Sequence, residues 1–155
     1  GAAHAAVFDA TSQIAAICAD WARTAGLPEG PDSVLQLGLP PRPLGVVFDG
    51  DHLRRVLVNL LDNGLRHGSR TPGALQVQLA TVSDARASLT VASDGAPIPA
   101  DTERYLFEPF FSTRSRGTGL GLYICRELCE RYGAAIEYRA RGEGVRHTNE
   151  FSVTM

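Results

Sequence analysis

The segment that most constrains the fold is Gly117-Thr118-Gly119-Leu120-Gly121-Leu122, where glycine takes every second position. Glycine has no Cβ, so the backbone can approach a ligand closely and its amides can point at anionic oxygens. The apolar run from Leu120 to Tyr132 predicts a helix that begins at these glycines. Unpaired N–H groups and the helix dipole both favour phosphate at a helix start. The motif indicates either a phosphate-binding loop or a flexible turn before a helix, and both interpretations stay open on the glycines alone.

A second polar group lies upstream, in the stretch from Asn59 to His67. At about 100° per residue, one helix face is apolar and a separate face carries Asn59, Asn63 and Arg66. Amide oxygens suit Mg²⁺, and a guanidinium can reach a terminal phosphate. The alternative is an ordinary amphipathic helix with its polar side in water. The apolar stripe consists of Leu53, Val56, Leu57, Leu60 and Leu61.

Periodicity and turn residues predict the remaining elements of one domain. Helices are expected over 9–25, 51–67 and 120–132, and strands near 34–37, 45–48, 75–79, 87–92, 135–138 and 151–155. Gly133 is expected to end the last helix. This order of elements predicts helices on one face of a mixed sheet.

With these motifs together, the chain resembles the ATP-binding catalytic domain of bacterial two-component sensor histidine kinases, in the superfamily of gyrase, Hsp90 and MutL. Asn59–His67 resembles the family's N box, Phe107–Phe111 its F box and Gly117–Leu122 its G2 box. The resemblance runs from about Val7 to Met155. It implies a Bergerat-type α+β two-layer sandwich: a mixed, mostly antiparallel sheet of about five strands, covered on one face by about three helices.

The resemblance also implies ATP and Mg²⁺ as cofactors and a role for each matched position. Asn63 would hold Mg²⁺ with help from Asn59, and Arg66 would contact phosphate. His67 would border the nucleotide, or it is a helix-end residue with no task. A short lid over 111–117 would close on the phosphates. The other expected nucleotide contacts are Ser93, Asp94, Gly95, Ile98, Arg114, Arg116, Gly117, Thr118, Gly119, Leu120, Gly121 and Leu122.

One motif departs from the family pattern. The family's G1 box reads Asp-x-Gly-x-Gly-Ile, whereas this chain has Ser93–Pro99 there. Alignment on Gly95 and Ile98 puts Ser93 at the Asp that receives the adenine amino group, and Pro97 at the second glycine. A hydroxyl accepts that bond without charge assistance, so we expect weaker nucleotide binding than in a member with Asp.

The residue four positions before Asn63 bears on the reaction. Relatives that hydrolyse ATP, such as gyrase, carry Glu there to activate water, and this chain has Asn59. An amide cannot take a proton at neutral pH, so transfer of the γ-phosphoryl group to a histidine is expected instead. His4, His52 and His147 lack the sequence context of the family's phosphoacceptor.

We therefore expect an excised catalytic domain, with residues 1–8 as residual linker and 9–155 as the ATP-binding domain. The implied partners are the parent protein's own dimerisation segment, which carries the acceptor histidine in a homodimer, and a response regulator. Two alternatives remain. One is a degenerate nucleotide-binding module, indicated by Ser93 and Pro97, and the other is an anti-sigma-type serine kinase, which shares the fold.

Composition sets limits on location and partners. A formal net charge of −2 argues against a surface built for nucleic acid. Three cysteines without a CxxC pair argue against a disulfide framework or a zinc site and favour a reducing compartment. No apolar run approaches the roughly 20 residues of a membrane span, and no signal peptide is recognisable. A cytoplasmic domain is expected, and any membrane anchor of the parent would lie elsewhere.

Overall fold

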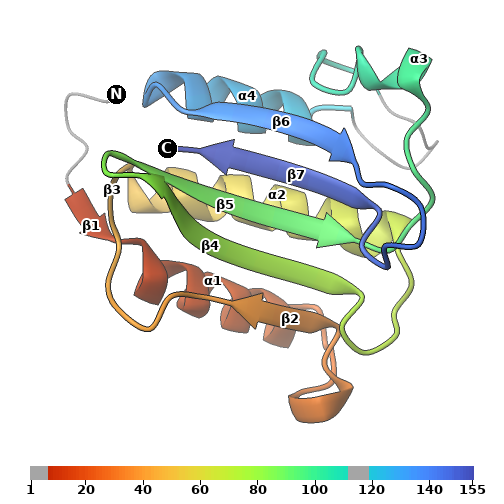
Figure 1. The fold of residues 1–155 in the computed structure, drawn as a ribbon, viewed down its shortest axis with the longest axis horizontal. Helices are drawn as coiled ribbons and strands as arrows, with labels where there is room; N and C mark the ends of the chain where they lie inside the picture. Colours follow the sequence, from red (N-terminus) through yellow and green to blue (C-terminus); the bar gives the residue numbers. More distant parts are fainter. Residues whose placement is uncertain (1–6, 112–118) are drawn as a thin grey trace.

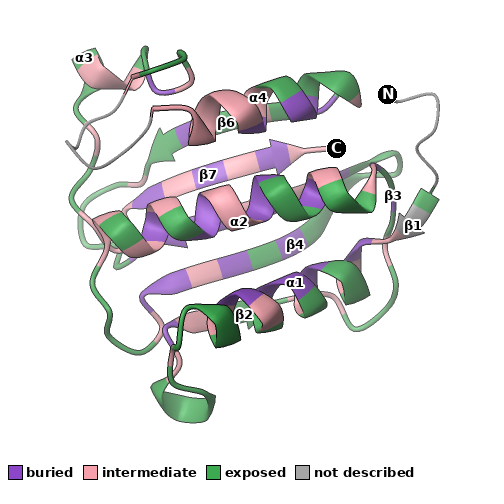
Figure 2. Ribbon diagram, turned by 180° about the vertical axis from the view of Figure 1, so that it is seen from behind, coloured by how far each residue is buried: buried purple, intermediate pink, exposed green. Residues whose placement is uncertain are grey.

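Two layers make up the computed structural model, which describes residues 7–111 and 119–155. A five-stranded sheet forms one layer, and the helices α1 (Ala10–Thr24), α2 (Gly50–His67) and α4 (Gly121–Arg131) all cover the same face of it (Figures 1 and 2). The predicted two-layer α+β sandwich is confirmed, and each of the three predicted helices lies within two residues of its expected ends.

The sheet has the strand order β2-β4-β5-β7-β6. Only β2 and β4 pair in parallel, and the other three pairs are antiparallel, as predicted. Along the central strands, buried and more exposed residues alternate, because one side of the sheet packs on the helices and the other is open. The strands are β2 (Leu35–Gly38), β4 (Leu75–Ser83), β5 (Arg86–Ser93), β6 (Ala135–Ala140) and β7 (Asn149–Thr154).

Three short elements were not predicted. Strand β1 (Val7–Asp9) pairs with β3 (Gly45–Val47) in a separate two-stranded sheet, so the strand expected near 45–48 forms outside the main sheet. A 3-10 turn covers Gly30–Asp32, and a four-residue helix, α3 (Ala100–Glu103), follows β5. Tertiary contacts determine where such short elements form, because they contain too few residues to show a periodic sequence pattern.

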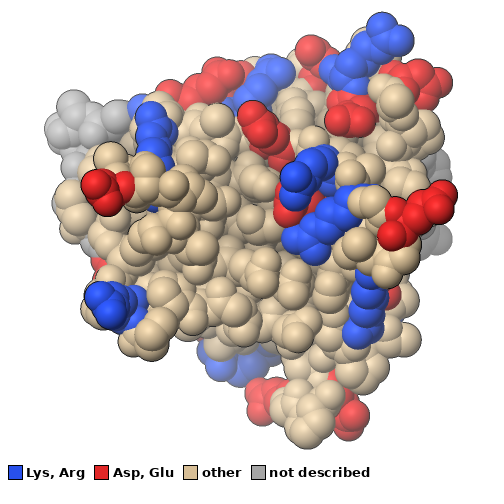
Figure 3. Space-filling model, viewed as in Figure 1, with Lys and Arg blue, Asp and Glu red and all other residues tan. Residues whose placement is uncertain are grey.

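The open face of the sheet carries charges of both signs side by side (Figure 3). Arg139 and Arg141 each pair with Glu150, at 3.1 and 2.9 Å between nitrogen and oxygen. These contacts link β7 to β6 and to the residue that follows β6.

Helix α2 is held to the rest of the molecule by its apolar stripe. All five stripe residues, Leu53, Val56, Leu57, Leu60 and Leu61, are at most 1% exposed. The next helical turn, at Gly64, lies so close to the sheet that an added Cβ would meet Leu75 Cδ2 at 2.4 Å. The polar face of α2 is thereby fixed in orientation.

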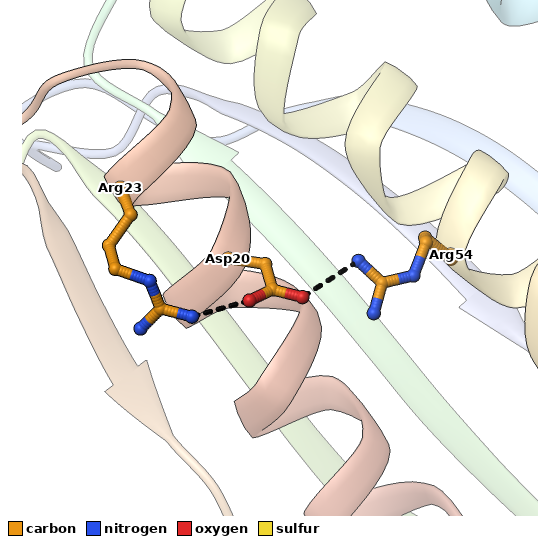
Figure 4. A network of polar contacts seen from close by, with 3 residues as sticks. All are labelled: Asp20, Arg23 and Arg54. Atoms are coloured by element: carbon orange, nitrogen blue, oxygen red, sulfur yellow. Dashed lines mark hydrogen bonds and ion pairs between the residues drawn. The ribbon is translucent and has the colours of Figure 1, made fainter.

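Two polar contacts join α1 to α2. The indole Nε1 of Trp21, which is 6% exposed, donates to Asp62 Oδ1 at 2.8 Å. Asp20 forms an ion pair with Arg23 in its own helix, and with Arg54 of α2 at 3.2 Å (Figure 4). Exposed ion pairs contribute little because water already solvates both charges. The buried indole N–H depends on its acceptor much more strongly.

Asp62→Ala should therefore lower the free energy of unfolding by about 1–2 kcal/mol, because it leaves the Trp21 N–H without its acceptor. As the control, Arg54→Ala removes only an exposed partner of Asp20 and should cost at most about 0.5 kcal/mol. Urea denaturation followed by tryptophan fluorescence measures both. Equal losses in the two variants would contradict this ranking.

Candidate functional site

The polar face of α2 presents the residues that the sequence singled out. Asn59, Asn63 and His67 are half-buried and Arg66 is exposed. The two asparagines lie one helical turn apart on the same side of α2, at the edge of the buried stripe. His67 Nδ1 lies 2.9 Å from the Asn63 carbonyl oxygen, so this ring nitrogen carries the proton and donates to its own helix.

The Asn59 carboxamide faces the start of α4. A Cβ added to Gly121, the first residue of α4, would lie 3.7 Å from Asn59 Oδ1 and 3.9 Å from its Cγ. The two motifs, far apart in sequence, therefore meet in space. Glycine at this position leaves the helix start open to the carboxamide.

A backbone contact fixes how the chain enters α4. Gly119 has a φ of +74°, which favours glycine, and an added Cβ would lie 2.4 Å from the Phe110 carbonyl carbon. The Phe110 amide donates to Gly119 O at 2.8 Å. The end of the expected F box is thus joined directly to the glycine motif. Four residues with expected phosphate contacts, Arg114, Arg116, Gly117 and Thr118, lie outside the described residues.

At the other end of the site, β5 ends at Ser93, which is buried beneath the last turns of α2. The Ser93 Cβ lies 3.6 Å from the position of a Cβ on Gly64 and 3.8 Å from one on Gly68. Its hydroxyl has no hydrogen bond to another residue of 7–111 or 119–155 in this structure. Ser93 is 6% exposed.

Asp94 has a different set of contacts. Its carboxylate accepts from the Ser69 amide at 2.8 Å and from the Ser69 hydroxyl. Burial raises the pKa of Asp94, but the hydrogen bonds from Ser69 outweigh it and hold the pKa below its ordinary value. Asp94 therefore holds the loop after α2 as a carboxylate.

The segment Gly95–Ile98 after β5 lies directly against the end of α2. A Cβ on Gly95 would lie 2.1 Å from the His67 carbonyl oxygen, so only glycine allows this approach. Ile98 and Leu122 are half-buried and pack against the hydrophobic core.

Two buried polar residues next to this segment escaped the sequence analysis. Asn149 of β7 donates from Nδ2 to Gly95 O and Ala96 O, at 2.9 and 3.0 Å. Tyr138 of β6 donates to Asn149 Oδ1 and accepts from the Ile98 amide. Burial raises the pKa of Tyr138, which keeps the phenol protonated as a donor. The only signal in the sequence was that the polar Asn149 lies two residues before Phe151, so both face the same side of the strand.

The donor set fits a magnesium ion that brings its own phosphate ligands. Among the described residues, no group of three or more His, Cys, Asp or Glu side chains is placed to hold a metal ion. Two half-buried carboxamides, Asn59 and Asn63, offer neutral oxygens on one helix face. Mg²⁺ usually takes few protein ligands and completes its shell with phosphate oxygens and water, which suits this pair.

The cysteines belong to the hydrophobic core, and one of them, Cys125, lies within hydrogen-bond reach of the Asn59 side chain. Cys18, Cys125 and Cys129 are buried and free, and burial raises the pKa of each thiol to about 12. They pack as small apolar groups, as expected. No helix in the described part of the chain is both long and apolar enough to span a bilayer.

Sequence relatives of this chain are sensor kinases. It is 47% identical over 116 residues to the sensor protein kinase PilS of Pseudomonas aeruginosa, covering 73% of this chain and 22% of that protein. It is 38% identical over 112 residues to the C4-dicarboxylate transport sensor protein DctB of Rhizobium meliloti, covering 72% and 18%. The chain thus spans about a fifth of the length of these relatives.

Solved structures share the fold. The mycobacterial sensor histidine kinase MprB superposes with a TM-score of 0.79 at 22% identity, covering 97% of this chain and 96% of that one. The catalytic domain of the histidine kinase ThkA also gives 0.79, at 23% identity, covering 98% and 95%.

A family model agrees with both comparisons. Residues 48–155 match the model described as histidine kinase-, DNA gyrase B-, and HSP90-like ATPase. The matched range includes both polar motifs and the end of β5. The chain belongs to this family of ATPases, and its relatives within the family are sensor histidine kinases.

Proposed function

We propose that this chain binds Mg-ATP and donates the γ-phosphoryl group to a histidine on the dimerisation segment of a homodimeric sensor kinase, for relay to a response regulator. Residues 9–155 would form the catalytic domain, on the cytoplasmic side. The observation that carries the proposal is the Asn59 carboxamide beside Gly121, at the open start of α4. A metal-binding face and a phosphate-binding helix end then border one site.

Each residue of the site has a limited task in this reaction. Asn63, with Asn59, would hold a bound Mg²⁺, which neutralises charge on the transferring phosphoryl group. The first amides of α4 and the exposed Arg66 would bind phosphate oxygens. Asn59 cannot act as a base toward water, so the chain favours positioning for transfer over hydrolysis.

The base end of the site rests on Ser93. Ser93 is 6% exposed, and its hydroxyl has no hydrogen-bond partner among the described residues, which supports Ser93 as the acceptor for the adenine amino group. The Asp94 carboxylate is already hydrogen-bonded to Ser69, which argues against Asp94 in that role.

A second candidate is a nucleotide-binding module that transfers no phosphate, favoured by Ser93 and Pro97 in the G1 box. Incubation with labelled Mg-ATP and a separately supplied acceptor hairpin distinguishes the two. Acid-labile phosphate on the hairpin histidine supports the kinase. Nucleotide binding without transfer supports the module, and acid-stable phosphoserine on a partner would indicate a serine kinase instead.

Asn63→Ala should weaken the binding of an Mg-bound ATP analogue by about 10- to 100-fold, because it removes a metal ligand. Binding measured with EDTA should change little. Gln76→Ala, which removes a carboxamide from the open face of the sheet, is the control and should leave both affinities unchanged. Calorimetric titration with and without Mg²⁺ measures this, and an equal loss under both conditions would argue against a metal role.

Ser93→Asp should strengthen binding of the nucleotide by about tenfold, because a charged acceptor forms a hydrogen bond roughly twice as strong. Ser88→Asp on the open face of the same strand controls for added negative charge and should have no effect. The same titration measures both variants. If Ser93→Asp brings no gain, the alignment of Ser93 with the adenine-binding Asp is wrong.

A further inference from the structure

Tyr138 and Asn149 form a buried polar pair on the side of the sheet that packs on the helices. They are 8% and 5% exposed, and their inward-facing neighbours Phe151 and Val153 are apolar. The Tyr138 hydroxyl donates to Asn149 Oδ1. A polar group buried among apolar side chains is costly unless every donor and acceptor finds a partner.

Among the described residues, the remaining side-chain partners of the pair belong to one short loop. Both carbonyls at Gly95 and Ala96 accept from Asn149 Nδ2, and the Ile98 amide donates to the Tyr138 phenol oxygen at 3.0 Å. Pro97, which has no N–H, lies between these bonds. The pair therefore holds the loop on both sides of the proline, using only backbone groups that the proline leaves available.

This loop forms part of the candidate site. It follows Ser93 directly, and at Gly95 it is pressed against the His67 carbonyl at the end of α2. The pair contacts the same loop from strands β6 and β7. The loop is thereby fixed between α2 and the two buried side chains.

We propose that Tyr138 and Asn149 are positioning residues for nucleotide binding, which fix loop 95–98 against the end of α2 and so preform the base end of the site. They act through the loop backbone and do not touch the nucleotide. The inference rests on the proposed function, since it assigns these residues to the same site.

Asn149→Asp tests the inference with little change of size. The variant still accepts from Tyr138, but it replaces the amide donors with an oxygen that faces the carbonyls of Gly95 and Ala96 and repels them. Tyr138→Phe removes the hydroxyl and keeps the ring, whose centroid lies 5.1 Å from that of Phe151. Affinity for the Mg-bound ATP analogue should fall at least tenfold in Asn149→Asp and several-fold in Tyr138→Phe.

Tyr132→Phe is the matched control. The Tyr132 hydroxyl is hydrogen-bonded to His52 Nδ1, and Tyr132 lies at the opposite end of α4 from Gly121. It should lower the melting temperature about as much as Tyr138→Phe while leaving nucleotide affinity unchanged. If affinity falls equally in the two Tyr→Phe variants, or is unchanged in Asn149→Asp, the inference is overturned.

Amide exchange at Ile98 gives a readout that needs no nucleotide. Tyr138→Phe should speed exchange at Ile98 well beyond that at Val91 in the middle of β5, because the bonded acceptor is lost. Unchanged exchange at Ile98 would overturn the inference alone. Absence of nucleotide binding by the unaltered chain would instead overturn the proposed function, so the two failures are distinguishable.

Discussion

The packing of α2 on the sheet is the constraint on which the rest of this structure depends. Its leucine stripe is almost completely buried, and Gly64 brings the helix into close contact with Leu75 and Ser93. Because an α-helix is rigid, burial of one face determines where the other face points. The Asn59 side chain that meets the start of α4 is therefore oriented by the apolar contacts of other residues in the same helix.

Much of the fold could be predicted because its main elements are long and strongly patterned. The apolar stripe of α2 has a helical period over several turns, and burial alternates along β5 from Arg86 to Val91. The short strand β1 was not predicted, since it has three residues and is defined by its pairing with β3, and the predicted strand β3 could not be assigned to its separate sheet. The four-residue helix α3 carries no readable period for the same reason.

The residues of the candidate site also divide into those that could be predicted from the sequence and those that could not. Strand alternation predicts different surroundings for Ser93 and Asp94, and in the structure Asp94 accepts from Ser69 whereas Ser93 lies beneath Gly64. The meeting of Asn59 with Gly121 followed only from the family resemblance, because no local pattern sets the distance between two helices. Tyr138 and Asn149 bind backbone groups of a distant segment. Because nearly every residue has the same backbone amide and carbonyl, the sequence does not indicate which of them a side chain will bind.

The deep burial of all three thiols has a practical consequence. With a pKa near 12, each remains protonated and shielded at neutral pH, so maleimide reagents have no native thiolate to attack. A cysteine introduced on the surface would then be labelled alone, without first removing Cys18, Cys125 or Cys129. Fluorescent or spin probes at chosen positions could report how the domain moves while its native interior stays intact.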